Sequence, residues 1–266
     1  YGGCLRSGLS HANIVKIDTS KAKAIPGVKA VLTAADVAKP QSWADYNYLA
    51  DKIRYIGDAV AIVAAEYKES LADALKAIEV EYEELPGVYT IDEALEPDAI
   101  QIREKGVGLV DGIPTAGTKG NIFLDSYFPI RKGNVDDGFK QCDVVIEREY
   151  RTQFAEHSYI EPEACVAVSN PVDGTMTVFS SSQNPHFGRR YIADALQIPM
   201  NKARLVQQTL GGSFGGKEEL VGLVIGRAAL LAKATNRPVK MVLSREESIL
   251  ESSKRHPFRF RYKVGA

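Results

Sequence analysis

The sequence predicts an α+β fold in two domains, residues 1–112 and 113–266. Residues 59–65 form a continuously apolar run, which is typical of a strand buried on both faces. Apolar residues at helical spacing follow, so this part of the chain has the elements for a core of its own. A glycine-rich stretch with little periodicity, at about 103–120, is typical of a linker. We place the boundary near Gly112.

The first domain is predicted to combine short strands with one amphipathic helix. Alternating apolar and polar residues predict strands at 14–18 and 80–85. Residues 28–33, which follow a Pro-Gly turn, favour another strand. Residues 71–78 place two leucines and an isoleucine at helical spacing, with charged residues between them. We therefore expect a helix here that packs on the buried strand.

The second domain is predicted to begin with a strand and a hairpin. Residues 144–150 have strand-like composition. Residues 164–168 and 175–180 flank the turn-rich segment 169–174, which predicts a hairpin connection. Residues 187–196 favour a helix.

A strand, loop, helix and second strand then follow one another along the chain. The strands are predicted at 203–210 and 239–243, and the glycine loop at 211–216. Residues 218–235 predict a strongly apolar helix. Ser-Arg-Glu-Glu at 244–247 is a capping box, which predicts the start of a further helix.

Composition and charge exclude several classes of protein. The chain has 33 basic and 34 acidic residues without strong clustering, which argues against a nucleic-acid binder. No apolar run reaches the length of a membrane span. The three cysteines, Cys4, Cys142 and Cys165, lack metal-ligand spacing, and sparse thiols fit a cytoplasmic protein. We expect Cys142 and Cys165 to be inert core thiols on strands.

The stretch Gly-Gly-Ser-Phe-Gly-Gly-Lys-Glu at 211–218 is the strongest candidate for a binding loop. Glycines let a ligand approach the backbone closely, and a loop that enters a helix presents free N–H groups. A nucleotide phosphate loop is excluded, because Glu218 stands where Ser or Thr must bind magnesium. A dinucleotide-binding turn is excluded because Ser213 interrupts the glycine spacing. A tight turn with only a structural purpose remains the alternative.

Three segments of the second domain agree in order and spacing with a known family. They are Ser-Ser-Gln-Asn at 181–184, the loop at 211–218 and Arg-His-Pro-Phe at 255–258. Together they resemble the molybdopterin-binding subunit of the xanthine dehydrogenase and aldehyde oxidase family. Shorter matches extend the resemblance over nearly the whole chain: 5–7, 10–12, 17–20, 26–28, 55–58, His157, 160–162 and 261–265. The N-terminal matches resemble the α/β-hammerhead domain of that family, followed by the first part of its molybdenum-cofactor-binding domain.

The resemblance implies roles for four residues. Gln183 is expected to hydrogen-bond an oxo ligand of molybdenum. Phe214 is expected to place a ring beside the substrate, and Gly215 to offer a backbone N–H to a ligand of the metal. Glu218 matches a carboxylate that contacts the heterocycle in purine-oxidising members. No residue of this chain is expected to ligate the metal, and the catalytic base is expected from residues outside it.

Three of these residues also have a structural alternative. Gln183 could hydrogen-bond a turn, and Phe214 could be a core ring. Glu218 is predicted to open a helix, where the helix dipole favours a carboxylate without any substrate. Lys217 is interpreted as a solvated or structural charge. The four histidines share no pattern and receive no chemical role.

The resemblance implies a molybdenum-dependent oxidoreductase that hydroxylates a purine or related N-heterocycle with oxygen from water. It implies a molybdopterin-type cofactor, in which the cytosine dinucleotide form is one option, and FAD and 2Fe-2S clusters on partner subunits or domains. Expected partners are a C-terminal molybdopterin-binding half, iron–sulfur and FAD subunits, and further copies in an oligomer. There are two alternatives. The chain could belong to an aldehyde oxidoreductase of the same family, or it could be a non-catalytic fragment or assembly module.

The resemblance also implies that this chain is a fragment or one part of a divided subunit, and that it is inactive alone. We therefore expect the apolar helix at 218–235 to leave a face for the remaining part to cover. Residues 1–112 are expected to fold independently.

Overall fold

The structure is a computed structural model that describes residues 1–38, 47–103, 109–110, 113–114, 118–123, 129–218 and 220–266. The expected domain boundary at Gly112 lies outside the described residues, so the division at this point stays a prediction. Within the part of the chain described, no helix is long and apolar enough to cross a membrane.

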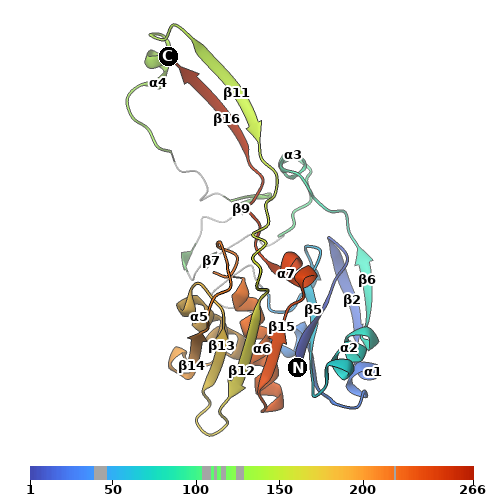
Figure 1. Cartoon of the computed structure of the whole chain (residues 1–266). Helices are drawn as coiled ribbons and strands as arrows, with labels where there is room; N and C mark the ends of the chain where they lie inside the picture. Colours follow the sequence, from blue (N-terminus) through green and yellow to red (C-terminus); the bar gives the residue numbers. More distant parts are fainter. Residues whose placement is uncertain (39–46, 104–108, 111–112, 115–117, 124–128, 219) are drawn as a thin grey trace.

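One seven-stranded mixed sheet forms the body of the molecule, in the order β14-β13-β12-β15-β1-β5-β3 (Figure 1). Its strands come from both predicted domains: β1 (Gly2–Arg6), β3 (Val28–Thr33), β5 (Ala59–Ala65), β12 (Ala164–Ser169), β13 (Met176–Ser180), β14 (Ala203–Gln207) and β15 (Val239–Val242). The two groups of strands meet where β1 pairs in parallel with β15, with Gly2 opposite Met241. The two halves of the chain therefore share a sheet.

The N-terminal strands confirm the sequence predictions closely. All seven residues of β5 are buried, and β3 covers the predicted residues. Helix α2 (Lys68–Ala77) packs against β5 and β1, as its amphipathic pattern predicts. A second, three-stranded sheet lies beside this core and consists of β4 (Lys52–Ile53), β2 (Ala12–Asp18) and β6 (Glu79–Glu84). The remaining short elements of this half are α1 (Ser20–Lys23), η1 (Ala34–Asp36) and α3 (Ile91–Leu95).

The C-terminal half adds the predicted hairpin and helices. Strands β12 and β13 pair antiparallel, which confirms the hairpin. Helix α5 (Pro185–Leu196) follows β13, and a capping box on Ser244 opens α7 (Arg245–Glu251), as predicted. The short elements from residue 109 onward are β7 (Leu109–Val110), β8 (Ile113–Pro114), β9 (Thr118–Lys119), β10 (Ile122–Phe123), α4 (Val135–Phe139) and η3 (Met200–Lys202).

Helix α6 (Val221–Thr235) corrects two expectations. It begins at Val221 with Leu220 as its N-cap, so Glu218 stands before the helix and does not open it. Twelve of its residues, from Val221 to Ala232, are buried. The helix packs against α5 and against strands from both halves of the sheet, so this chain itself covers the apolar surface that was expected to stay open.

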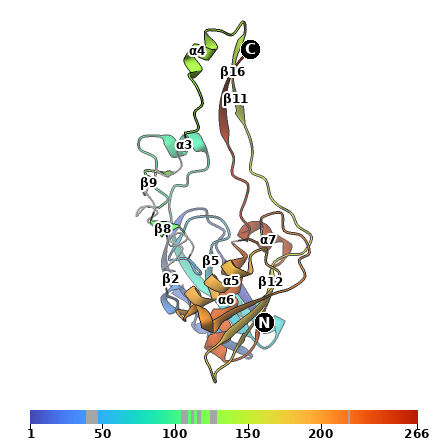
Figure 2. The same ribbon diagram turned by 90° about the vertical axis from the view of Figure 1, so that its left-hand side faces the viewer.

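A long two-stranded ribbon projects from the body, as Figures 1 and 2 show. It pairs β11 (Val145–Arg151) with β16 (Arg259–Gly265) over seven residues of each strand. All seven residues of β11 are exposed, and only two of β16 are partly covered. Cys142 precedes β11 outside any strand and is only partly buried, so the expectation of a core thiol there is wrong. Cys165 on β12 is buried as expected.

A buried ionic cluster connects the two halves of the body. Glu251 of α7 accepts hydrogen bonds from Arg6 of β1 and from Arg227 of α6, the latter at 2.7 Å. Arg227 also donates to the carbonyl oxygen of Tyr48 at 2.7 Å. Burial alone raises the pKa of Glu251, but the two guanidinium groups outweigh that effect and lower it. The carboxylate is therefore held ionised between the two arginines.

Candidate functional site: a glycine loop and the glutamine that faces it

The predicted glycine loop connects β14 to α6. Gly212 and Gly215 adopt φ values of +94° and +99°, a region in which residues with a side chain are strained. Phe214 lies between them at φ +52°, which is uncommon for any residue other than glycine. Phe214 is 77% exposed, so the alternative of a core ring is wrong. The loop thus exposes the ring of Phe214 to solvent, and the backbone of this residue is strained in that position.

Gln183 lies against this loop from the neighbouring strand end. It follows β13 and immediately precedes Asn184, the N-cap residue of α5. Its side-chain oxygen accepts a hydrogen bond from the backbone N–H of Gly215 at 2.9 Å and another from the hydroxyl of Ser213. Because a backbone N–H can only donate, the atom facing Gly215 is the amide oxygen. The Nε2 group of Gln183 can therefore donate a hydrogen bond to a ligand.

The underside of the loop is held by Glu161 and Lys217. One oxygen of Glu161 accepts from the backbone N–H of Gly211 and from the ammonium of Lys217, both at 2.8 Å. Lys217 is fully buried, and its Nζ lies 4.7 Å from the centroid of the Tyr159 ring. Lys217 is therefore an internal residue of the loop, which confirms the structural alternative of its interpretation and excludes a solvated charge.

Close packing also explains one of the glycines. A Cβ on Gly216 would lie 2.5 Å from Cε1 of Tyr159 and 3.0 Å from Nδ1 of His157. The loop can therefore approach the segment that carries these rings only with glycine at this position. Sequence reasoning missed Ser213, Tyr159 and Glu161 as site neighbours, although Glu161 belongs to one of the shorter motif matches.

The structure thus brings three of the four predicted site residues together. Gln183 and Gly215 share a hydrogen bond, and Phe214 precedes Gly215 in the same turn. Glu218 lies at the exit of the loop, where its backbone N–H donates to the carbonyl oxygen of Gly215 at 3.3 Å. Its side chain is exposed. The carboxylate is available to a ligand near the loop.

The chemistry of these groups fits a cofactor that carries its own metal ligands. Among the described residues, no group of three His, Cys, Asp or Glu side chains is placed to hold a metal ion. The site instead offers a neutral amide donor and an exposed ring. Such groups can hydrogen-bond an oxo ligand and stack on a flat ring without coordinating a metal. The residues present therefore fit a molybdopterin-type group.

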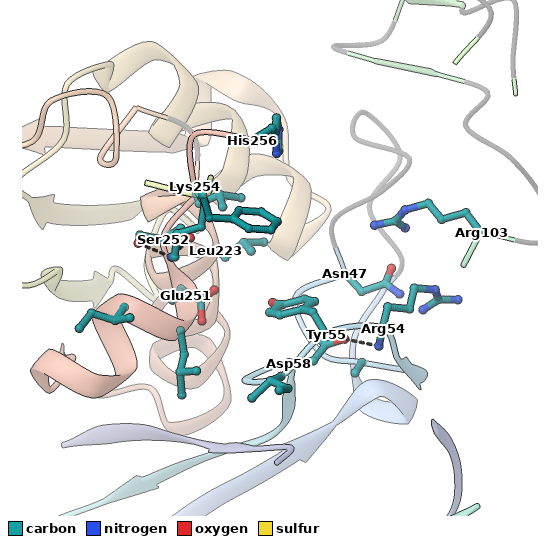
Figure 3. A pocket seen from close by; sticks show the side chains of 16 residues that line it. Asn47, Arg54, Tyr55, Asp58, Arg103, Leu223, Glu251, Ser252, Lys254 and His256 are labelled. Carbon is teal, nitrogen blue, oxygen red and sulfur yellow. Dashed lines mark hydrogen bonds between the residues drawn. The ribbon is translucent and has the colours of Figure 1, made fainter. Parts of the chain in front are cut away.

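A separate cavity of about 550 Å³ lies beside α7, between the segment that includes Tyr55 and Asp58 and the start of α6 (Figure 3). Its lining includes Leu223 and Glu251 but none of the four predicted site residues. Asp58 is 7% exposed, and burial raises the pKa of its carboxyl from 3.8 to about 6. Because its lining contains none of the predicted site residues, this cavity is distinct from the glycine loop.

Comparisons with known proteins agree with the loop. A model of the molybdopterin cofactor-binding domain matches residues 117–266, and one of the aldehyde oxidase and xanthine dehydrogenase a/b hammerhead domain matches residues 1–86. The chain is 41% identical to the nicotinate dehydrogenase large molybdopterin subunit of Eubacterium barkeri, over all of this chain and 59% of that protein. It is 38% identical to a probable xanthine dehydrogenase subunit of Bacillus subtilis, over all of this chain and 34% of that protein.

Solved structures give the same result. The carbon monoxide dehydrogenase of Oligotropha carboxidovorans matches with a TM-score of 0.84 at 29% identity, over all of this chain and 34% of that one. The aldehyde oxidoreductase of Desulfovibrio gigas matches with a TM-score of 0.82 at 26% identity, over all of this chain and 29% of that one. The chain thus spans a part of each relative's length. It belongs to the xanthine dehydrogenase and aldehyde oxidase family of molybdenum hydroxylases, with a hammerhead region followed by the start of the cofactor-binding domain.

Proposed function

We propose that the chain is part of a molybdenum hydroxylase that oxidises a purine or related N-heterocycle with oxygen from water. The observation that carries the proposal is the hydrogen bond from Gly215 to Gln183, which fixes the amide beside an exposed aromatic ring. Two relatives, a nicotinate dehydrogenase and a probable xanthine dehydrogenase, are named after nitrogen heterocycles, which supports this substrate class.

Each site residue has a role that its geometry allows. Gln183 donates from Nε2 to an oxygen of the cofactor, and the exposed ring of Phe214 stacks on a flat substrate. Gly215 differs from its expected role, because its N–H already donates to Gln183 and so orients the amide. When bound, the molybdopterin-type cofactor supplies the metal that takes up electrons from the substrate.

The wider assembly is also part of the proposal. A C-terminal molybdopterin-binding half completes the site and covers the exposed ribbon of β11 and β16. Iron–sulfur and FAD subunits or domains accept the electrons, in a cytoplasmic oligomer. The cofactor is of the molybdopterin type, and the cytosine dinucleotide form is one option. The exposed aromatic and aliphatic side chains of the ribbon, which include Tyr150, Tyr262 and Val264, support a covering partner.

Aldehyde oxidation is the second candidate function, since the aldehyde oxidoreductase of Desulfovibrio gigas superimposes over the whole chain. Glu218 separates the two candidates. A carboxylate can accept a hydrogen bond from a ring N–H of a heterocycle, whereas an aldehyde group offers no such donor.

The test is Glu218→Gln in the assembled molybdenum enzyme, with Glu69→Gln on α2 as a matched control. Turnover of xanthine should fall by about ten- to a hundredfold, because a charge-assisted contact is lost, while turnover of benzaldehyde should change little. The control should match wild type on both substrates. Equal losses on both substrates would contradict the assignment of Glu218, and wild-type activity on benzaldehyde alone would favour the second candidate.

A further inference from the structure

We propose that Lys217 and Glu161 are positioning residues that hold the glycine loop closed and thereby aim the amide of Gln183. This inference rests on the proposed function for its catalytic meaning, but the geometry stands without it. A buried ammonium is unfavourable unless it is paired and hydrogen-bonded. Lys217 has no exposed surface, and its carboxylate partner is Glu161 at 2.8 Å.

The Glu161 carboxylate connects the two ends of the loop. Its Oε2 accepts from the N–H of Gly211, where the loop begins, and from the side chain of Lys217, where the loop ends. The backbone N–H of Glu161 also donates to the carbonyl oxygen of Gly211 at 3.3 Å. Burial by itself raises the pKa of Glu161, but hydrogen bonds from Lys217 and Gly211 outweigh it and lower the pKa. The carboxylate therefore stays ionised at neutral pH.

The backbone of Lys217 is hydrogen-bonded to Gln183 and connects it to the closed loop. Its carbonyl oxygen accepts from the backbone N–H of Gln183 at 2.9 Å, and its own N–H donates to the hydroxyl of Ser213 at 3.1 Å. That hydroxyl in turn donates to the side-chain oxygen of Gln183. Lys217 thus holds both the backbone of Gln183 and the group that orients its amide. Release of the Lys217 side chain should free the amide to rotate.

A purely structural salt bridge would have a different consequence. It would add to the stability of the whole body without a specific effect on Gly215 or Gln183. Hydrogen exchange distinguishes the two cases, because it reports the opening of individual backbone N–H groups.

The experiment compares the 266-residue chain with Lys217→Met, Glu161→Ala and Glu161→Gln, and with Lys233→Met on α6 as a control. In the first two variants, exchange at Gly215 and Lys217 should rise at least tenfold, while β12 and β13 keep their rates. Glu161→Gln keeps an acceptor for both donors but removes the charge that pairs with Lys217, so its exchange should rise less than in Glu161→Ala and not remain at the wild-type rate. The Gln183 side-chain amide resonance should shift most in Lys217→Met and Glu161→Ala.

Unchanged exchange at Gly215 in both Lys217→Met and Glu161→Ala would overturn the inference, and so would a uniform increase over the whole sheet. Lys217→Met keeps the test decisive if Glu161→Ala fails to fold, because it removes the buried ammonium and leaves a carboxylate that is 36% exposed to water. In the assembled enzyme, Lys217→Met should lower kcat more than it raises KM for xanthine. A wild-type enzyme without molybdenum or heterocycle turnover would contradict the proposed function but leave the exchange result valid.

Discussion

The seven-stranded sheet and the β11–β16 ribbon are both built by strand pairing but lie in opposite environments. In β5 all seven residues are buried, whereas in β11 all seven are exposed. Helix α6 lies on the sheet and supplies the second layer of a core, while no described element plays that part for the ribbon (Figure 1). The difference shows that strand pairing determines the shape of a segment, but only a covering layer buries its side chains.

Aromatic side chains of the ribbon contact one another. The rings of Phe258 and Phe260 stack with centroids 5.3 Å apart, and Phe260 stacks on Tyr262 at 5.9 Å. Tyr150 on the opposite strand meets Tyr262 edge-on at 5.8 Å. Two strands alone are marginally stable in water. We therefore expect changes in the body to affect the free energy of unfolding far more than changes in the ribbon.

The largest expected effect is that of Arg227→Met, which removes one arginine from the buried cluster. Glu251 would keep only Arg6 as a cationic partner, and the free energy of unfolding should fall by about 3–5 kcal/mol. The matched change in the ribbon is Arg261→Met, which breaks an exposed pair with Glu147 and should have an effect within about 1 kcal/mol. Urea unfolding measures both. Losses of equal size would remove the distinction between body and ribbon.

Asp58 gives an intermediate effect that depends on pH. Its carboxyl has a pKa of about 6 in the folded chain against 3.8 for the free group, so the folded state binds the proton more tightly. Stability should therefore fall as the pH rises from about 4 to 6, and the full penalty should remain above that range. Asp58→Asn should raise the free energy of unfolding by about 2–3 kcal/mol at pH 8 and by little at pH 4. The same gain at both pH values would show that ionisation of Asp58 is not responsible.

The smallest effect is expected from a pair of glycine substitutions. In α6, a Cβ on Gly226 would lie 2.2 Å from the buried ring of Tyr48, so Gly226→Ala should cost about 1–3 kcal/mol. In α4, near the end of the ribbon, nothing lies within 4 Å of a Cβ on Gly138. Gly138→Ala should cause no loss and a gain of up to about 1 kcal/mol, since alanine favours helix. Thermal melts of the two variants compare them directly, and a loss in Gly138→Ala would contradict the open environment.

The strongest local patterns predicted the fold well. Continuous apolarity identified β5, and helical spacing of apolar residues identified α2. Both signals come from the sequence of the segment itself, so no distant residue is needed to recognise them. The joining of β1 to β15 was not predicted, since a pairing between residues 2 and 241 leaves no periodic signal in either segment. The start of α6 was placed too early because a run of glycines and charges gives no clear cap.

The candidate site was predicted from a resemblance and only partly from local patterns. The loop and Gln183 were identified through motif spacing, and the structure places them in contact. Lys217 stayed open between a solvated and a structural charge, because a lysine after two glycines has the composition of a surface turn. Only the position of Glu161, 56 residues earlier in the chain, makes burial of that charge favourable. The pairing of Lys217 with Glu161 forms only when the fold brings the two residues together, so the local sequence around either residue does not show it.

The parallel pairing of β1 with β15 has a consequence for how this polypeptide can be divided. The N-terminal strand is flanked by β15 and β5, so the sheet is completed only after residue 239 has been synthesised. A backbone break between α3 and α4 would leave two pieces joined by strand pairing and by the contacts of α6 with β3 and β5. The pieces would behave as complementing fragments that reassemble when they are produced together. The sheet that crosses between the halves therefore holds them together in addition to the peptide connection.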